Sequence, residues 1–199
     1  FLRKEEAWPD EAERRLQLYS DEEVISSCEY THYAKPDSID TQLIILRRYF
    51  AHKTCDELLS RTSLPIGAEG WFAIPRWQLV ASTYNEAVHY VLGILDATLR
   101  GAFVNRRKGR IGPSQLRESK KKMTAFQILS ERQGGNDILV VPAQFGARHQ
   151  GQSARRADAV MTPLECSLGA FEVAVMLLTH PKRLMALDPW VDCTGDEYS

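Results

Sequence analysis

The amino-acid sequence predicts an α/β or α+β fold, in which several helices pack against a small central sheet. Three observations carry this prediction. Residues 138–141 form a continuous apolar run rich in β-branched side chains, which is typical of a strand buried in a sheet. Residues 71–74 form a second short strand that a proline ends, and residues from about 163 to 180 are apolar on nearly every side, as in a core helix. With 199 residues, of which 44% are hydrophobic, the chain is expected to form a single domain over residues 1–199.

The N-terminal end is expected to form a helical appendage over residues 1–35. Pro9 suits the first turn of a helix, and Ser20 with Glu23 matches a capping box for another. Residues 1–29 hold nine acidic and four basic side chains, so this end of the chain is acidic.

Three helices are expected in the middle of the chain. Asp40 is placed to cap the first, and Thr83 with Glu86 forms a capping box for the second. Ser114 is expected to open the third, and two glycines end it. The apolar face of this third helix is expected to consist of Leu116, Met123, Phe126 and Leu129.

The core helix has the strongest start signal in the chain. Thr162, Pro163 and Glu165 supply a cap, a first-turn proline and a capping-box acid in register. The helix is therefore predicted to run from about residue 163 to His180, with Phe171 in the core.

A basic segment lies between the second and third of these helices and continues into the third. Residues 100–122 hold nine of the 25 basic residues and one acid, although the net charge of the chain is −1. Such a run can contact the phosphate backbone of nucleic acid, or it can be a solvated charged surface. Residues 106–122 of this segment contain no aromatic residue that would stack on a base. The candidate backbone contacts are Arg106, Arg107, Lys108, Arg110, Arg117, Lys120, Lys121 and Lys122.

A second candidate site follows the predicted strand at 138–141. Ligands of α/β sheets bind beyond the carboxyl ends of strands, and the loop at 145–156 carries glycines that allow a close backbone approach. Its arginines suit phosphate or carboxylate, unless acids elsewhere in the chain pair with them. The candidate anion-binding residues are Arg148, Ser153, Arg155 and Arg156.

The same loop offers a catalytic alternative. His149 can act as an acid or a base near neutral pH, and acids near the C-terminal end could assist it. This hypothesis requires His149 to converge on one pocket with Asp192, Asp196 and Glu197. The sequence predicts no metal site and indicates no particular cofactor.

The cysteines and the hydropathy indicate a compartment. The four cysteines are far apart, which favours reduced thiols, and the longest apolar run, residues 173–178, is too short to span a bilayer. Residues 1–10 lack the apolar core of a secretion signal. We therefore expect a cytoplasmic protein without a membrane partner.

Several stretches resemble a group of uncharacterised bacterial proteins with no assigned activity. They are G-A-E-G-W-F-A-I-P at 67–75, D-I-L-V-V-P-A-Q-F-G-A-R-H-Q-G-Q-S-A-R-R-A at 137–157, L-G-A-F-E-V-A-V-M-L-L-T-H-P at 168–181 and D-C-T-G-D-E-Y at 192–198. The resemblance implies a bacterial cytoplasmic origin and assigns no catalytic residue.

Three hypotheses about function follow. The leading one is the binding of a phosphate-bearing partner, nucleic acid foremost, through the basic surface. The second is a hydrolase or transferase that acts on a phosphorylated or nucleotide substrate. The third is a structural subunit whose acidic N-terminal part and basic middle pair with other chains.

Overall fold

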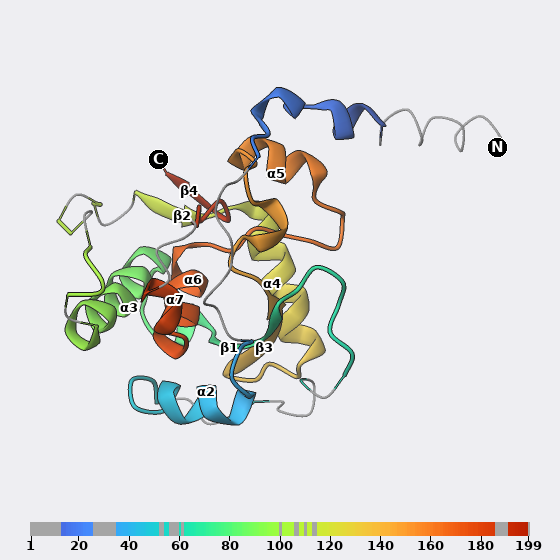
Figure 1. Ribbon diagram of the computed structural model, residues 1–199. Helices are drawn as coiled ribbons and strands as arrows, with labels where there is room; N and C mark the ends of the chain where they lie inside the picture. Colours follow the sequence, from blue (N-terminus) through green and yellow to red (C-terminus); the bar gives the residue numbers. More distant parts are fainter. Residues whose placement is uncertain are drawn as a thin grey trace.

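The computed structural model describes residues 13–25, 35–51, 54–55, 60, 62–99, 101–105, 108–109, 111–112, 115–185 and 191–198. They form an α+β fold in which helices surround two small antiparallel sheets (Figure 1). The helices are α2 (Ile39–Leu46), α3 (Tyr84–Thr98), α4 (Lys120–Arg132), α5 (Ala154–Val160), α6 (Ala170–Thr179) and α7 (Lys182–Met185), with short 3-10 turns η2 (Ser20–Glu22), η4 (Trp77–Leu79) and η5 (Ala147–His149). The strands are β1 (Gly70–Pro75), β2 (Leu116–Glu118), β3 (Ile138–Ala143) and β4 (Asp196–Tyr198).

The central sheet consists of the two strands that the sequence predicts. β1 and β3 pair antiparallel, from Gly70 opposite Ala143 to Pro75 opposite Ile138. β3 extends two residues beyond the predicted run at 138–141, and Pro142 lies opposite Trp71 inside the ladder. The C=O of Trp71 and the N–H of Ala73 point away from β3, toward Gln42. The Trp71–Pro142 pair is therefore a non-hydrogen-bonded pair of the ladder. Because no N–H is needed from residue 142 at such a position, the proline removes no hydrogen bond between the strands.

Two buried glutamines satisfy the outer edges of this sheet. The side chain of Gln42 on α2 accepts from Ala73 N at 2.9 Å and donates to Trp71 O at 2.8 Å. On the other edge, Gln133 after α4 accepts from Val140 N at 2.8 Å and donates to Val140 O at 3.0 Å. Each amide takes the place of a further strand, which explains how a two-stranded sheet can lie buried in the core.

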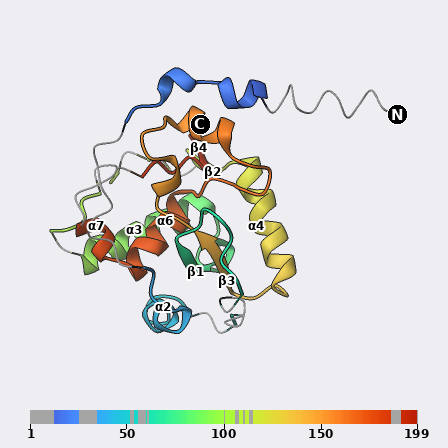
Figure 2. The ribbon, with the colours of Figure 1, turned by 45° about the vertical axis from the view of Figure 1, so that its right-hand side comes forward.

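Helices cover the sheet from opposite sides. Figure 2 shows β1 and β3 between α4 on one side and α3 with α6 on the other, and α2 lies below the strands. α6 packs against both α3 and β1. Phe171 of α6 and Phe72 of β1 are fully buried, so the predicted place of this helix in the core is confirmed.

The core helix begins later than predicted. Thr162 and Glu165 do form the expected contact, in which Thr162 N donates to the Glu165 carboxylate at 2.8 Å, but the chain makes only a turn there. Leu164 is 98% exposed. α6 starts after Gly169, whose N–H donates to the Glu172 carboxylate at 2.9 Å. The Thr162–Glu165 cap therefore does not start the helix. The start at Gly169 places Glu172 in the core, where it contacts Lys122 of α4.

The helix expected from Ser114 is also shorter. Residues 116–118 form β2, which pairs with β4, and α4 begins at Lys120 with Ser119 as its N-cap. Met123 is 52% exposed, so it does not belong to the apolar face. The pairing of β2 with a strand 80 residues away is a tertiary effect that local helical spacing does not contain.

Of the other predicted helix caps, one is confirmed and one is wrong. The capping box of Thr83 and Glu86 opens α3 as predicted, whereas α2 is capped by Ser38 and not by Asp40. Residues 13–17 are helical and lie, with η2, beside α5 (Figure 1). Within the described residues, no helix is both long enough and apolar enough to cross a membrane.

Candidate functional site

A buried ionic cluster joins four elements of the fold around Lys122. This side chain has no exposed surface, although the sequence interpretation placed it among the phosphate-contacting lysines. Its Nζ lies 2.9 Å from Glu172 Oε2, 3.1 Å from Asp196 Oδ1 and 3.4 Å from Glu118 Oε1. Lys122 therefore cannot contact nucleic acid at the surface, because its charge is used inside the protein.

Tyr84 completes the cluster from the first turn of α3. Its hydroxyl accepts from Lys122 Nζ at 2.8 Å and from Phe171 N at 3.3 Å, and donates to Asp196 Oδ1 at 2.7 Å. The Lys122 ammonium also lies 4.1 Å from the centre of the Tyr84 ring. Glu118, another member of the cluster, accepts a hydrogen bond on Oε2 from the indole N–H of Trp77 at 2.7 Å.

Burial and the neighbouring charges together shift the pKa values of the side chains in the cluster. Burial alone would lower the pKa of Lys122, but Glu172 and Asp196 outweigh it and raise that pKa. Burial raises the pKa of Glu172 in spite of Lys122. Burial, followed by the charges of Glu172 and Asp196, raises the pKa of Tyr84, so its phenol remains a hydrogen-bond donor.

Two glycines make room for this arrangement. A Cβ on Gly169 would collide with Asp196 Oδ1, Lys122 Nζ and the Tyr84 hydroxyl. A Cβ on Gly195 would collide with the backbone at Ser167 and Leu168. The close approach of the chain before α6 to the chain before β4 therefore requires glycine at both positions.

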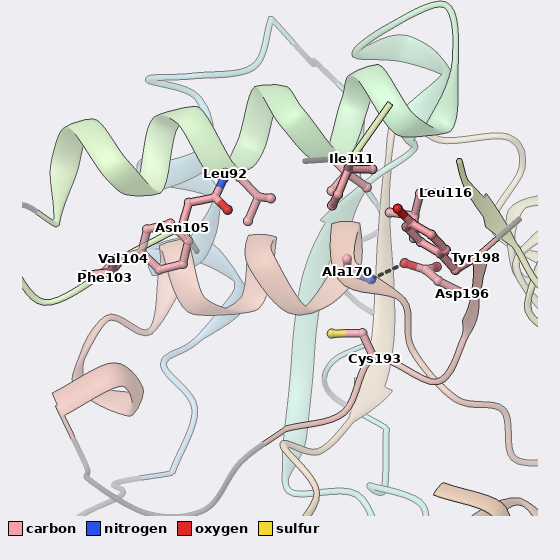
Figure 3. A pocket seen from close by; sticks show the side chains of 11 residues that line it. Leu92, Phe103, Val104, Asn105, Ile111, Leu116, Ala170, Cys193, Asp196 and Tyr198 are labelled. Carbon is pink, nitrogen blue, oxygen red and sulfur yellow. Dashed lines mark hydrogen bonds between the residues drawn. The ribbon is translucent and has the colours of Figure 1, made fainter. Parts of the chain in front are cut away.

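A pocket of about 450 Å³ opens beside the cluster, between α3, α6 and the segment that leads to β2. Figure 3 shows Leu92 of α3 pointing toward α6, with Asp196 and Cys193 near the start of that helix. Asp196 Oδ2 accepts from Ala170 N at 2.7 Å, which anchors the carboxylate at the pocket wall. The lining residues are Val88, Leu92, Phe103, Val104, Asn105, Ile111, Leu116, Ala170, Cys193, Asp196 and Tyr198.

Cys193 is the lining residue that carries a thiol. Burial, and then the charge of Asp196, raise the pKa of its thiol to about 12. The thiol is thus protonated at neutral pH and is a poor nucleophile.

The four candidate catalytic residues do not share one site. Asp196 lines the pocket, whereas His149 does not, and its Nδ1 lies 2.9 Å from Gln152 Oε1. Glu197 is exposed and pairs with Arg117, and Asp192 is exposed. The convergence that the catalytic hypothesis requires is not found.

The candidate anion-binding residues all contact carboxylates of the protein itself. Arg148 pairs with Glu165. Ser153 Oγ donates to Glu22 Oε2 and Arg155 Nη2 donates to Glu22 Oε1, while Arg156 Nε donates to Glu23 Oε1. Acids elsewhere in the chain were the stated alternative to an anion ligand, and they are Glu165 before α6 together with Glu22 and Glu23 of the N-terminal segment.

The basic segment is only partly described. Arg106, Arg107 and Arg110 lie outside the described residues. Lys108 pairs with Asp96, Arg117 with Glu197 and Lys121 with Asp158, all at the surface, and Lys120 is exposed. Such exposed pairs are weak, so they do not exclude a phosphate contact by these three residues.

Sequence reasoning missed Glu118, Glu172 and Tyr84 as parts of the site. Glu172 lies within the predicted core helix, and Glu118 counted only as the one acid in a basic run. The sequence did contain a signal for the two acids: Glu172 is isolated among apolar residues and Glu118 among basic ones. An acid that is buried needs a positively charged or hydrogen-bonding partner, so such isolated acids are candidates for a buried ionic cluster. Their convergence on Lys122 depends on the pairing of β2 with β4.

Comparisons of this chain with protein-family models, with curated proteins and with solved structures found no match. The site is therefore interpreted from its own geometry.

Proposed function

We propose that this protein binds a small, mainly apolar molecule in the pocket between α3 and α6. The observation that supports the proposal is the pocket itself: its volume of about 450 Å³ lies in the usual range for small-molecule sites, and apolar side chains form most of its wall. A few polar groups in an apolar wall are typical of such sites, because they orient a ligand that the apolar surface binds.

The residues divide the work of binding between them. Leu92, Phe103 and Ile111 offer apolar surface to the body of the ligand. Asp196 offers a fixed acceptor, since Tyr84 and Lys122 hold one oxygen and Ala170 N the other. A carboxylate held in this way does not have to reorganise when the ligand binds, which lowers the entropic cost of binding.

Binding of nucleic acid or of another phosphate-bearing partner stays a prediction from the sequence. It now rests on Arg106, Arg107, Arg110 and the exposed lysines, because Lys122 is buried and the described arginines of the 145–156 loop contact carboxylates. The hydrolase or transferase hypothesis also stays a prediction from the sequence, and Asp196 lines the pocket described here whereas His149 does not.

The pocket proposal is tested by narrowing the pocket with tryptophan. Val104 lines it and is 70% exposed, so Val104→Trp can obstruct the entrance without disturbing the core. Val24 is also 70% exposed and does not line the pocket, so Val24→Trp is the matched control. Leu92→Trp fills the interior as a second variant.

The measurement is binding of two neutral probes, 2-phenylethanol and 1-naphthalenemethanol, by saturation-transfer NMR and by isothermal titration calorimetry. We expect the native chain and Val24→Trp to bind alike and Val104→Trp to lose at least about tenfold in affinity. Absence of binding to the native chain, or equal binding by all variants, contradicts the proposed function.

A further inference from the structure

We propose that the ligand of this pocket carries an ammonium group, which binds against Asp196. This inference rests on the proposed function, because it specifies the chemical class of the molecule that the pocket takes.

The first argument is the place of Asp196 in the wall. Among the described residues that line the pocket, it is the one that is charged at neutral pH, and the rest are apolar or neutral polar. A positive group on the ligand would therefore meet one opposite charge and an otherwise apolar surface, in which Coulomb attraction is stronger than in water.

The second argument is the remaining acceptor capacity of this carboxylate. A carboxylate offers about four acceptor positions. Oδ1 accepts from the Tyr84 hydroxyl and from Lys122 Nζ, while Oδ2 accepts from Ala170 N. Among the described residues no second donor to Oδ2, the oxygen that faces α6, is present, so this oxygen can accept a hydrogen bond from a ligand.

The third argument is the balance of charge behind the wall. Three carboxylates, of Glu118, Glu172 and Asp196, surround the single ammonium of Lys122. The cluster thus contains three carboxylates but only one ammonium group. Arg117, on β2 beside the cluster, pairs with the exposed Glu197 and not with these acids. An ammonium in the pocket supplies a second positive charge, whereas a carboxylate ligand would add a fourth negative one.

The apolar lining of the pocket indicates what the part of the ligand beyond the ammonium group is like. Leu92, Phe103 and Ile111 line the pocket, and in Figure 3 Ile111 lies nearest to Asp196, Leu92 farther away and Phe103 farthest. The molecule that fits is therefore an amine with an apolar body, in which the ammonium lies at the α6 end and the body extends toward residues 103–105.

The test uses the native chain and three ligands of nearly the same size: 2-phenylethylammonium, 2-phenylethanol and phenylacetate. Dissociation constants are measured by calorimetry at neutral pH and constant ionic strength. We expect the ammonium to bind at least about tenfold more tightly than the alcohol, and the carboxylate to bind most weakly. The carboxylate also tests the basic residues between Asn105 and Ile111, because tightest binding of phenylacetate would overturn the inference in favour of an anion site.

Two variants locate the preference. Asp196→Asn keeps the shape but removes the charge, so the ammonium should lose its advantage over the alcohol. Asp192→Asn changes an exposed acid outside the pocket and should keep that advantage. If Asp196→Asn does not fold, the ligand series on the native chain still decides the question.

The two proposals fail in different ways. If the alcohol and the ammonium bind equally and Val104→Trp weakens both, the pocket binds apolar molecules and the ammonium inference is wrong. If none of the three ligands binds, the proposed function itself is wrong.

Discussion

At the scale of single residues, Lys122 shows how a charge is tolerated in the core. A lysine without exposed surface is stable only when opposite charges and hydrogen bonds replace water. Lys122 has Glu172 and Asp196 within 3.1 Å and the Tyr84 hydroxyl at 2.8 Å. These partners raise its pKa although burial alone would lower it. The ammonium is thus the centre to which α4, α6 and β4 are joined.

Removal of this ammonium is expected to destabilise the protein strongly. Lys122→Met keeps the length of the side chain but leaves buried carboxylates without a counter-charge, and such a change costs about 3–5 kcal/mol. The free energy of unfolding is measured by urea denaturation followed by circular dichroism. Lys121→Met, at the exposed neighbour, is the control and should change it by less than about 0.5 kcal/mol. A loss below about 1 kcal/mol for Lys122→Met would mean that the cluster does not hold the fold together.

At the scale of elements, the two glutamines determine how helices attach to the sheet. Gln42 connects α2 to β1, and Gln133 connects the end of α4 to β3. A sheet of two strands has two open edges, and buried edges need partners for their N–H and C=O groups. The amide side chain offers both N–H donors and an acceptor oxygen at the right spacing, which no apolar side chain can do.

Gln42→Leu is therefore expected to be destabilising in spite of its similar size. The change leaves Ala73 N and Trp71 O buried without a partner, and each such group costs about 1–3 kcal/mol. The total loss should be about 2–5 kcal/mol, measured by chemical denaturation. Gln127→Leu, on the exposed side of α4, is the matched control and should be near neutral. Equal effects of the two variants would show that the edge contacts are not important for stability.

At the scale of the whole molecule, the uneven charge of the sequence is partly neutralised within the chain. The described N-terminal residues, 13–25, lie beside the Gly151–Arg156 region, where Glu22 and Glu23 contact Ser153, Arg155 and Arg156. Backbone contacts support them, since Val24 N donates to Gly151 O at 2.8 Å. The third hypothesis, pairing of acidic and basic parts between chains, thus has a counterpart inside one chain.

These contacts predict how the N-terminal segment can be released. In a Glu22→Gln, Glu23→Gln double variant the ion pairs with Arg155 and Arg156 are lost, so the segment should open more often and trypsin should cleave at Arg14 or Arg15 severalfold faster. The cleavage is followed by mass spectrometry in native buffer. Asp21→Asn, which alters an acid without such an ion pair, is the control. Unchanged cleavage of the double variant would show that backbone contacts alone hold the segment.

The sequence by itself determined the mixed α and β character, the two central strands, the start of α3 and the burial of Phe171. These features depend on local runs, caps and apolar spacing, which act between residues close together in the chain. It could not determine that residues 116–118 form a strand, that α6 begins only after Gly169, or that Lys122 is buried. Each of these depends on β4, which returns from the far end of the chain to pair with β2 and brings Asp196 to Lys122, Tyr84 and the pocket. The tertiary structure decided the site because a charge is buried only where distant partners compensate for its lost hydration.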